Sequence, residues 1–295
     1  MAQHANHKPH SRPLYMAAIL TAAMSMPQGA DAGISFEDEF TGSSLGAEWN
    51  LNLGNDPEGA TTVVTNGGLN LNTPVVTGAR PGVEYNLDGA GAPVVTAGAD
   101  WTYEAAISLG MASDFDVTAA GEGIGITILA RDSAINTDHK AQINAVGLNF
   151  GGGFGHAVRG AGTTDGNTDP EAILQLGNGA APIDMTLRMA YEASSKTFEF
   201  GIDTGAGFVG LTDPFDITSW GMAGTDTFDL RLELSYVGFT QDNATSTFSV
   251  ETGEVVVDRV TIYDEALEVP APVPEPSSFS LLALGALGLA IRRRR

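Results

Sequence analysis

Five consecutive residues, Asp165-Gly166-Asn167-Thr168-Asp169, put oxygen-bearing side chains at alternate positions of the chain. Calcium prefers such carboxylate and amide oxygens, because it takes about six to eight hard oxygen ligands. We therefore predict a structural calcium ion held by Asp165, Asn167 and Asp169. Asp, Asn and Gly are also the residues of tight turns, so an Asp/Asn turn without a metal is the alternative.

This segment departs from the EF-hand calcium loop at two positions. Pro170 stands where that loop has its glycine, and Leu176 stands where it has its bidentate glutamate. Any calcium loop here must therefore be of another kind.

Few pairs of acidic residues on the predicted strands are placed so that they could hydrolyse a glycoside. Alternation along a strand puts Glu37 and Glu39 on one face, and Glu199 and Asp203 on one face. A glycosidase needs two carboxyl groups that flank the scissile bond. Glu37 and Glu39 lie at the edge of the domain, and Phe200-Gly201 separates the other pair. We predict solvated strand faces and no catalytic residue.

Histidine chemistry is also limited. The first three of the five histidines precede residue 11, within a segment that we predict to be removed. His139 and His156 remain, and neither lies near a G-x-S-x-G nucleophile motif. A catalytic triad is therefore not visible in the sequence.

Charge narrows the classes of partner. Residues 33–291 hold 35 Asp and Glu but only eight Lys and Arg, and the whole chain has a net charge of −22. Nucleic acid and anionic membrane surfaces are therefore poor partners, whereas cations are good ones. Solubility alone is an equally good reason for the acidity. The chain has no cysteine, so no disulfide supports it.

Both ends look like export signals. A basic, polar lead is followed by a moderately apolar run over residues 14–26 and by Ala30-Asp31-Ala32, a small-x-small cleavage pattern. We predict a signal peptide over residues 1–32 and a mature chain from Gly33.

At the C-terminal end, residues 279–291 carry no charge and would span roughly 20 Å as a helix, which is short for a bilayer of about 30 Å. A buried C-terminal helix is the alternative.

The C-terminal parts stand in a definite order. A proline-rich linker over residues 269–276 ends in Pro274, Glu275 and Pro276, and residues 277–295 form an apolar helix that ends in four arginines (Arg292, Arg293, Arg294 and Arg295). The arginines would stop the helix at the cytoplasmic side of the membrane. This order resembles the PEP-CTERM sorting signal of Gram-negative bacteria. The resemblance implies recognition by an exosortase and a destination in the cell envelope, at the cell surface or in the exopolysaccharide matrix.

Residues 33–268 read as one all-β domain. Short apolar runs with a period of two are separated by clusters of Gly, Asn, Thr and Asp, and no long amphipathic helix interrupts them. Asn66-Gly67 between two such runs predicts a tight hairpin. Residues 74–99 read as a loose segment, and residues 213–220 as one helical turn. We predict strands over residues 61–65, 69–72, 101–109, 123–130, 141–150, 154–159, 184–191, 198–203, 208–211, 228–236 and 254–263. Such a chain should form an antiparallel two-sheet sandwich.

The opening of this domain resembles the concanavalin A-like sandwiches. Phe40, Leu45 and Trp49 have the spacing of that family's first strands, and residues 255–263 look like its closing strand. The resemblance implies a jelly roll in which the first and last strands lie side by side. It also implies a structural calcium where they meet, with Asp258, a backbone carbonyl near Gly68 and Glu37 or Glu39 as ligands. The E-x-D-x-x-E motif of the family's laminarinases is missing.

Three functions remain open on these grounds. We expect a non-catalytic component of the cell surface or matrix. A carbohydrate-binding, lectin-like module is the alternative, although three tryptophans are too few to name an aromatic platform. A diverged glycoside hydrolase is the third, which the missing acid motif disfavours.

Overall fold

The structure is a computed structural model of the full chain. The structure describes residues 33–52, 60–77, 82–110, 122–133, 135–136, 138–149, 154–178, 181–238 and 247–270. The predicted signal peptide, the sorting motif and the apolar helix lie outside these residues. Among the described residues, no helix is long and apolar enough to cross a membrane.

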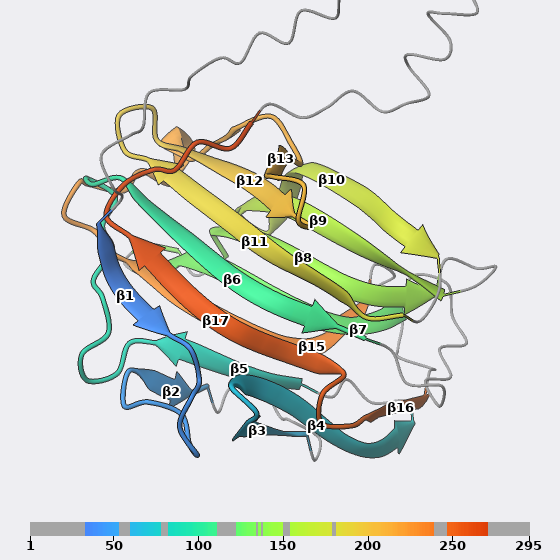
Figure 1. Ribbon diagram of the computed structural model, residues 1–295. Coiled ribbons are helices and arrows are strands. Elements are labelled where there is room, and N and C mark those ends of the chain that lie inside the picture. The colour runs from blue at the N-terminus through green and yellow to red at the C-terminus, as the bar shows by residue number, and fades with distance from the viewer. Residues whose placement is uncertain are drawn as a thin grey trace, which may run out of the picture. The chain divides into compact units, whose positions relative to one another are not determined.

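The described chain forms two antiparallel β-sheets that pack face to face (Figure 1). The ten-stranded sheet has the order β13-β12-β11-β6-β17-β4-β16, and β14, β1 and β3 pair with β12, β17 and β4 respectively. Its strands are β1 (Ile34–Asp38), β3 (Thr61–Thr65), β4 (Gly68–Thr77), β6 (Trp101–Leu109), β11 (Ile183–Glu192), β12 (Thr197–Asp203), β13 (Val209–Gly210), β14 (Phe215–Asp216), β16 (Thr247–Val250) and β17 (Val255–Tyr263).

The seven-stranded sheet covers the other side of the core. Its order is β10-β9-β8-β7-β15-β5-β2. Its strands are β2 (Trp49–Leu51), β5 (Gly82–Leu87), β7 (Glu122–Asp132), β8 (Lys140–Asn149), β9 (Phe154–Thr164), β10 (Asn167–Asn178) and β15 (Phe228–Gly238). The predicted antiparallel two-sheet sandwich is therefore confirmed.

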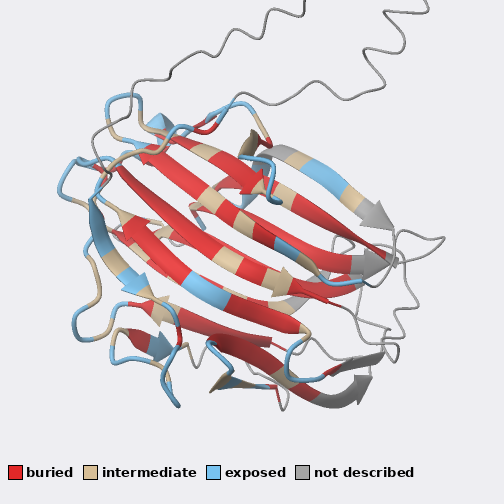
Figure 2. Cartoon of the chain, in the orientation of Figure 1, coloured by how far each residue is buried: buried red, intermediate tan, exposed pale blue. Residues whose placement is uncertain are grey.

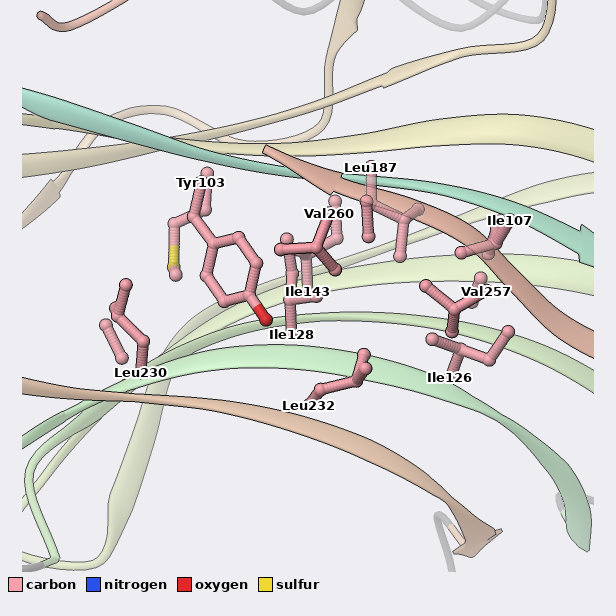
Figure 3. Packing of buried hydrophobic residues seen from close by; sticks show 14 of the residues in the cluster. Tyr103, Ile107, Ile126, Ile128, Ile143, Leu187, Leu230, Leu232, Val257 and Val260 are labelled. Atoms are coloured by element: carbon pink, nitrogen blue, oxygen red, sulfur yellow. The ribbon is translucent and has the colours of Figure 1, made fainter. Parts of the chain in front are cut away.

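Alternation decides which side chains enter the core. On β15, Leu230, Leu232 and Leu234 are buried between the sheets, whereas Arg231 and Glu233 face away from the core. Figure 2 shows the central strands of the sheets buried along most of their length. Figure 3 shows Leu232 and its neighbours from one sheet meeting residues such as Val257 and Val260 from the other. Burying one such aliphatic side chain contributes about 1.5–3 kcal/mol, which is why the period-two pattern forms this sandwich.

Two local predictions hold in detail. Asn66 (φ 55°) and Gly67 (φ 75°) both have positive φ and connect β3 to β4, as the Asn-Gly signal predicts. The first and last strands of the sandwich lie side by side, because Asp38 of β1 pairs with Val260 of β17.

Other predictions need correction. Residues 74–99 are not simply loose, because they contain the end of β4 and the whole of β5, whose Val83 and Tyr85 are buried. Asn167–Asn178 forms strand β10, and no predicted strand covers these residues. Within residues 213–220 only Thr218–Trp220 is helical, as one 3₁₀ turn.

The last described residues lie on the outer face of the ten-stranded sheet. Thr102 Oγ1 of β6 donates to the carbonyl of Glu265 (2.8 Å) and accepts the N–H of Leu267 (2.8 Å). Arg188 of β11 donates to the carbonyl of Glu268 (2.9 Å). Val269 is 9% exposed. The chain therefore reaches Pro270 on the side of the sandwich opposite to the seven-stranded sheet.

Candidate functional site

The outer face of the seven-stranded sheet carries a polar hollow of about 470 Å³. A binding site for a small ligand typically has a volume of about 300–1,000 Å³. We call it the sheet-face pocket, and it is lined by Asn52, Glu84, Leu129, Arg131, Lys140, Arg231 and Glu233. Strands β5, β7, β8 and β15 place six of these residues, and Asn52 follows β2.

Two glutamates meet in this pocket. Glu84 of β5 and Glu233 of β15 are directly opposite each other in the antiparallel pair, so their side chains project from the same face. Their carboxyl groups are joined by a hydrogen bond. Burial and the neighbouring Glu84 together raise the pKa of Glu233 to about 7, because a second negative charge there is costly. Near neutral pH the pair therefore shares one proton for much of the time.

Glu84 is held by further donors. Arg231 forms an ion pair with Glu84, and Asn52 donates its side-chain amide to the same oxygen. Arg231 also lies near Asp229, with 3.9 Å between their charged atoms. Burial raises the pKa of Asp229, and Arg231 opposes that shift. These contacts give the carboxyl pair one orientation instead of a mobile, solvated one.

A row of polar side chains continues from the pair across the sheet. Glu233 lies opposite Thr127 of β7, Thr127 opposite Asn144 of β8, and Asn144 opposite Arg159 of β9. Asn144 donates to the hydroxyl of Thr127, and both residues are buried although they face away from the core. The outer face therefore presents a line of hydrogen-bonding groups from β5 to β9, an arrangement that can bind a polar chain.

The geometry of the two glutamates bears on hydrolysis. Retaining glycosidases hold their two carboxyl groups about 5–5.5 Å apart, and inverting ones about 6.5–9.5 Å apart, so that a sugar or water fits between them. Glu84 and Glu233 contact each other directly. In this arrangement they act as one acidic unit that donates and accepts hydrogen bonds.

The predicted calcium segment forms a tight turn. Asp165 (φ 49°) and Gly166 (φ 77°) are the two residues between β9 and β10, where Thr164 pairs with Asn167. Asp165 Oδ1 accepts a hydrogen bond from Asn136 (2.8 Å) and lies 3.1 Å from His139 Nε2. The side chain of Asp169 lies outside the described residues.

His139 connects this turn to the body of the sheet. Its Nδ1 lies 3.3 Å from Asp132 Oδ2, and its ring stacks on Trp220 with centroids 5.1 Å apart. Asp132 is fully buried and also accepts the backbone N–H of Ile135 (2.9 Å). His139 thus bridges two aspartates, a feature that sequence reasoning missed because Asp165 lies in the turn between β9 and β10, whereas Asp132 and His139 flank the connection between β7 and β8.

His156 is far from this cluster along the strands. It pairs with Gly147 near the end of β8, whereas His139 precedes the start of β8. Burial lowers the pKa of His156, and the residue is 1% exposed. The two histidines that remain after residue 33 therefore do not act together.

The second predicted calcium site is assembled in part. Asp258 lies at an irregularity of β17, and its Oδ1 is 3.5 Å from the position that a Cβ on Gly68 would take. The carbonyl of Gly68 accepts a hydrogen bond from Asn70 (2.9 Å). Burial and nearby Asp184 raise the pKa of Asp258. Within the part of the chain that the structure describes, no three His, Asp or Glu side chains are grouped to hold a metal. The calcium site stays a prediction.

Comparison with known proteins identifies the C-terminal segment. Residues 272–295 match the PEP-CTERM protein-sorting motif, which contains Pro274, Glu275 and Pro276. No curated protein matches the chain.

Solved structures match the sandwich at low identity. One is a pseudo β-1,3-glucanase of Mycobacterium tuberculosis, with 16% identity, a TM-score of 0.49 and coverage of 79% of this chain and 99% of that one. Another is a winged bean acidic lectin complexed with methyl-α-D-galactose, with 12% identity, a TM-score of 0.48 and coverage of 79% and 98%. A third, the xyloglucan-locus GH43B protein of Bacteroides ovatus, has 13% identity and a TM-score of 0.48, and the match covers 78% of this chain but 39% of that one.

These comparisons and the structure together give the organisation of the chain. A sandwich of two antiparallel sheets is followed by a PEP-CTERM protein-sorting motif, which marks an exported protein that is sorted to the cell surface.

Proposed function

We propose that this protein is a non-catalytic component of the cell surface or exopolysaccharide matrix that binds polysaccharide in the sheet-face pocket. The observation that carries the proposal is the convergence of hydrogen-bonding side chains from four strands and the segment after β2 on one hollow. Sugars present many hydroxyl groups, and fixed donors and acceptors of this kind recognise them. The direct contact between Glu84 and Glu233 favours binding over hydrolysis.

The face of the sandwich from which the chain continues toward the sorting motif supports this role. Residues 265–269 are bound to the outer face of the ten-stranded sheet, whereas the sheet-face pocket lies on the outer face of the seven-stranded sheet. A sorting tail that leaves from Pro270 would therefore hold the protein by the side opposite to the pocket. An exosortase would process that tail, and export would begin with a signal peptide over residues 1–32.

Binding to exopolysaccharide extracted from the native host tests the proposal. The full chain should be retarded in gels that contain this polysaccharide, and Asn52→Ala in the pocket should weaken the retardation. Asn72→Ala, on β4 of the other sheet, is the matched control and should bind like the wild type. Reducing-sugar release is measured in parallel. Steady release above the Glu233→Gln variant would show that the protein is a hydrolase and overturn the non-catalytic role.

A further inference from the structure

Basic residues are unevenly distributed over this acidic protein. Seven Lys and Arg residues lie in the part of the chain that the structure describes. Four of them, Arg131, Lys140, Arg159 and Arg231, project from the outer face of the seven-stranded sheet. Residues 33–291 hold 35 acidic residues, so this concentration of basic residues on one face is contrary to the overall charge of the protein.

Two of these cations face each other. Arg131 of β7 and Lys140 of β8 are directly opposite in the sheet, and both line the sheet-face pocket. Like charges at directly opposite positions of an antiparallel pair are destabilising. Asp229 of β15 is opposite Arg131 on its other side and offsets part of the repulsion. Lys140 also attracts the carboxyl group of Glu233, so each cation of the pair has an acidic neighbour and still presents positive charge to the pocket.

The pocket also has two electrically distinct sides. Glu84 and Glu233 lie on β5 and β15, and Arg231 is already engaged by Glu84. Arg131 and Lys140 lie on β7 and β8, four residues along these strands from Thr127 and Asn144, and we call these two residues the basic strip. A linear ligand that lies across the pocket would meet the basic strip at one end and the carboxyl pair at the other.

We propose that the ligand of the sheet-face pocket is an anionic polysaccharide, whose carboxylate groups are bound by the basic strip. This inference rests on the proposed function, because it names the class of glycan that the same pocket takes. Arginine and lysine bind carboxylate through charge-assisted hydrogen bonds, which are stronger than neutral ones. The shared proton of Glu84 and Glu233 also favours an anionic ligand, because it removes one negative charge from the pocket.

Non-specific electrostatic attraction would not bind a polyanion to this protein. A protein with a net charge of −22 repels polyanions overall, so binding of a polyanion requires a local site. The matched probe is polygalacturonate, compared with the same polymer after complete methyl esterification, which keeps the sugar backbone and removes the charge. Dextran sulfate tests whether sulfate replaces carboxylate, and dextran is the neutral control.

The experiment measures the affinity of the full chain for each polymer by affinity electrophoresis at several salt concentrations. Polygalacturonate should bind about tenfold or more tightly than its methyl ester, and added salt should reduce this difference. Lys140→Gln should lose about tenfold in affinity for polygalacturonate and nothing for the ester. Lys140→Arg should retain binding, and Arg259→Gln, exposed on the opposite sheet, should match the wild type.

Each outcome is decisive. Equal affinity for the charged and esterified polymers would overturn the anionic ligand while leaving glycan binding intact. Loss of binding to every polymer, including host exopolysaccharide, would overturn the proposed function itself. Dextran sulfate binding that Lys140→Gln does not weaken would indicate an anion site elsewhere and would also overturn this assignment. Melting curves show whether each variant is folded. If a variant is not folded, the affinities of the wild type for polygalacturonate and for its methyl ester still test the anionic ligand.

Discussion

Glu233 of β15 and Glu84 of β5 lie directly opposite each other and share a hydrogen bond on the outer face of the seven-stranded sheet. Two carboxyl groups in contact cannot both ionise cheaply. Arg231 and Asn52 donate to Glu84, so Glu233 is the member that retains the proton. This relationship determines how the pocket responds to pH and to substitution.

Stability should fall as pH rises from about 4.5 to about 7. The folded pKa of Glu233 is raised from 4.5 to about 7, so in this window the folded state binds a proton that the unfolded state has released. Glu233→Gln cannot ionise, so it should lack this fall and be more stable than the wild type above pH 7. Urea unfolding at several pH values measures both effects.

Glu84→Gln is the control for that experiment. It removes the charged partner of Arg231, so it should lower stability at every pH rather than only change the pH profile. Identical pH profiles for the wild type and Glu233→Gln would contradict the shared proton.

Arg231→Ala should destabilise the protein by about 3 kcal/mol, because it leaves Glu84 buried without its ion-pair partner. The alternation on β15 alone would suggest a surface change that costs roughly 0.5 kcal/mol. Arg259→Ala, at an exposed position of β17, should show that small cost. Chemical denaturation of the two variants compares them. A small effect at both positions would mean that the ion pair contributes little.

Leu232→Ala should cost about 2–5 kcal/mol, since Leu232 is fully buried between the sheets and its removal leaves a cavity. Equilibrium unfolding in urea measures the loss. Leu51→Ala is a matched control, because Leu51 is 49% exposed, and its cost should be well under 1 kcal/mol.

Calcium can be tested by melting temperature. If one site binds only the folded state, a hundredfold excess of calcium over Kd should stabilise the protein by about 2.7 kcal/mol, an effect that sodium chloride at matched ionic strength does not reproduce. Asp258→Ala should abolish the shift if the site lies beside Gly68. Asp165→Ala with Asp169→Ala should abolish it if the site lies at the turn between β9 and β10. The absence of a calcium-specific shift in the wild type removes both sites.

Processing is measured by mass spectrometry of the protein from its native host. The mature form should begin near Gly33 and lack Arg292, Arg293, Arg294 and Arg295. Replacement of Pro274, Glu275 and Pro276 by alanine should leave the protein in the membrane. An intact C-terminus in the mature surface pool would contradict processing of the sorting tail.

The amino-acid sequence alone was sufficient for the features that depend on local order. Alternating residues predicted β6 (Trp101–Leu109) with its exact bounds. Asn66-Gly67 predicted its hairpin because both residues adopt positive φ. The PEP-CTERM motif is a contiguous segment, and it was recognised without any structure.

Only the tertiary structure decided the candidate site. Glu84 lies in β5, which the surrounding Pro and Gly residues concealed, and its ion pair with Arg231 joins residues 147 positions apart. The alternation showed that Arg231 and Glu233 face away from the core, but it could not show which strand pairs beside β15. Pairing between distant strands depends on the packing of the whole sheet and not on local propensity, and that pairing turns two separate acids into one proton-sharing unit.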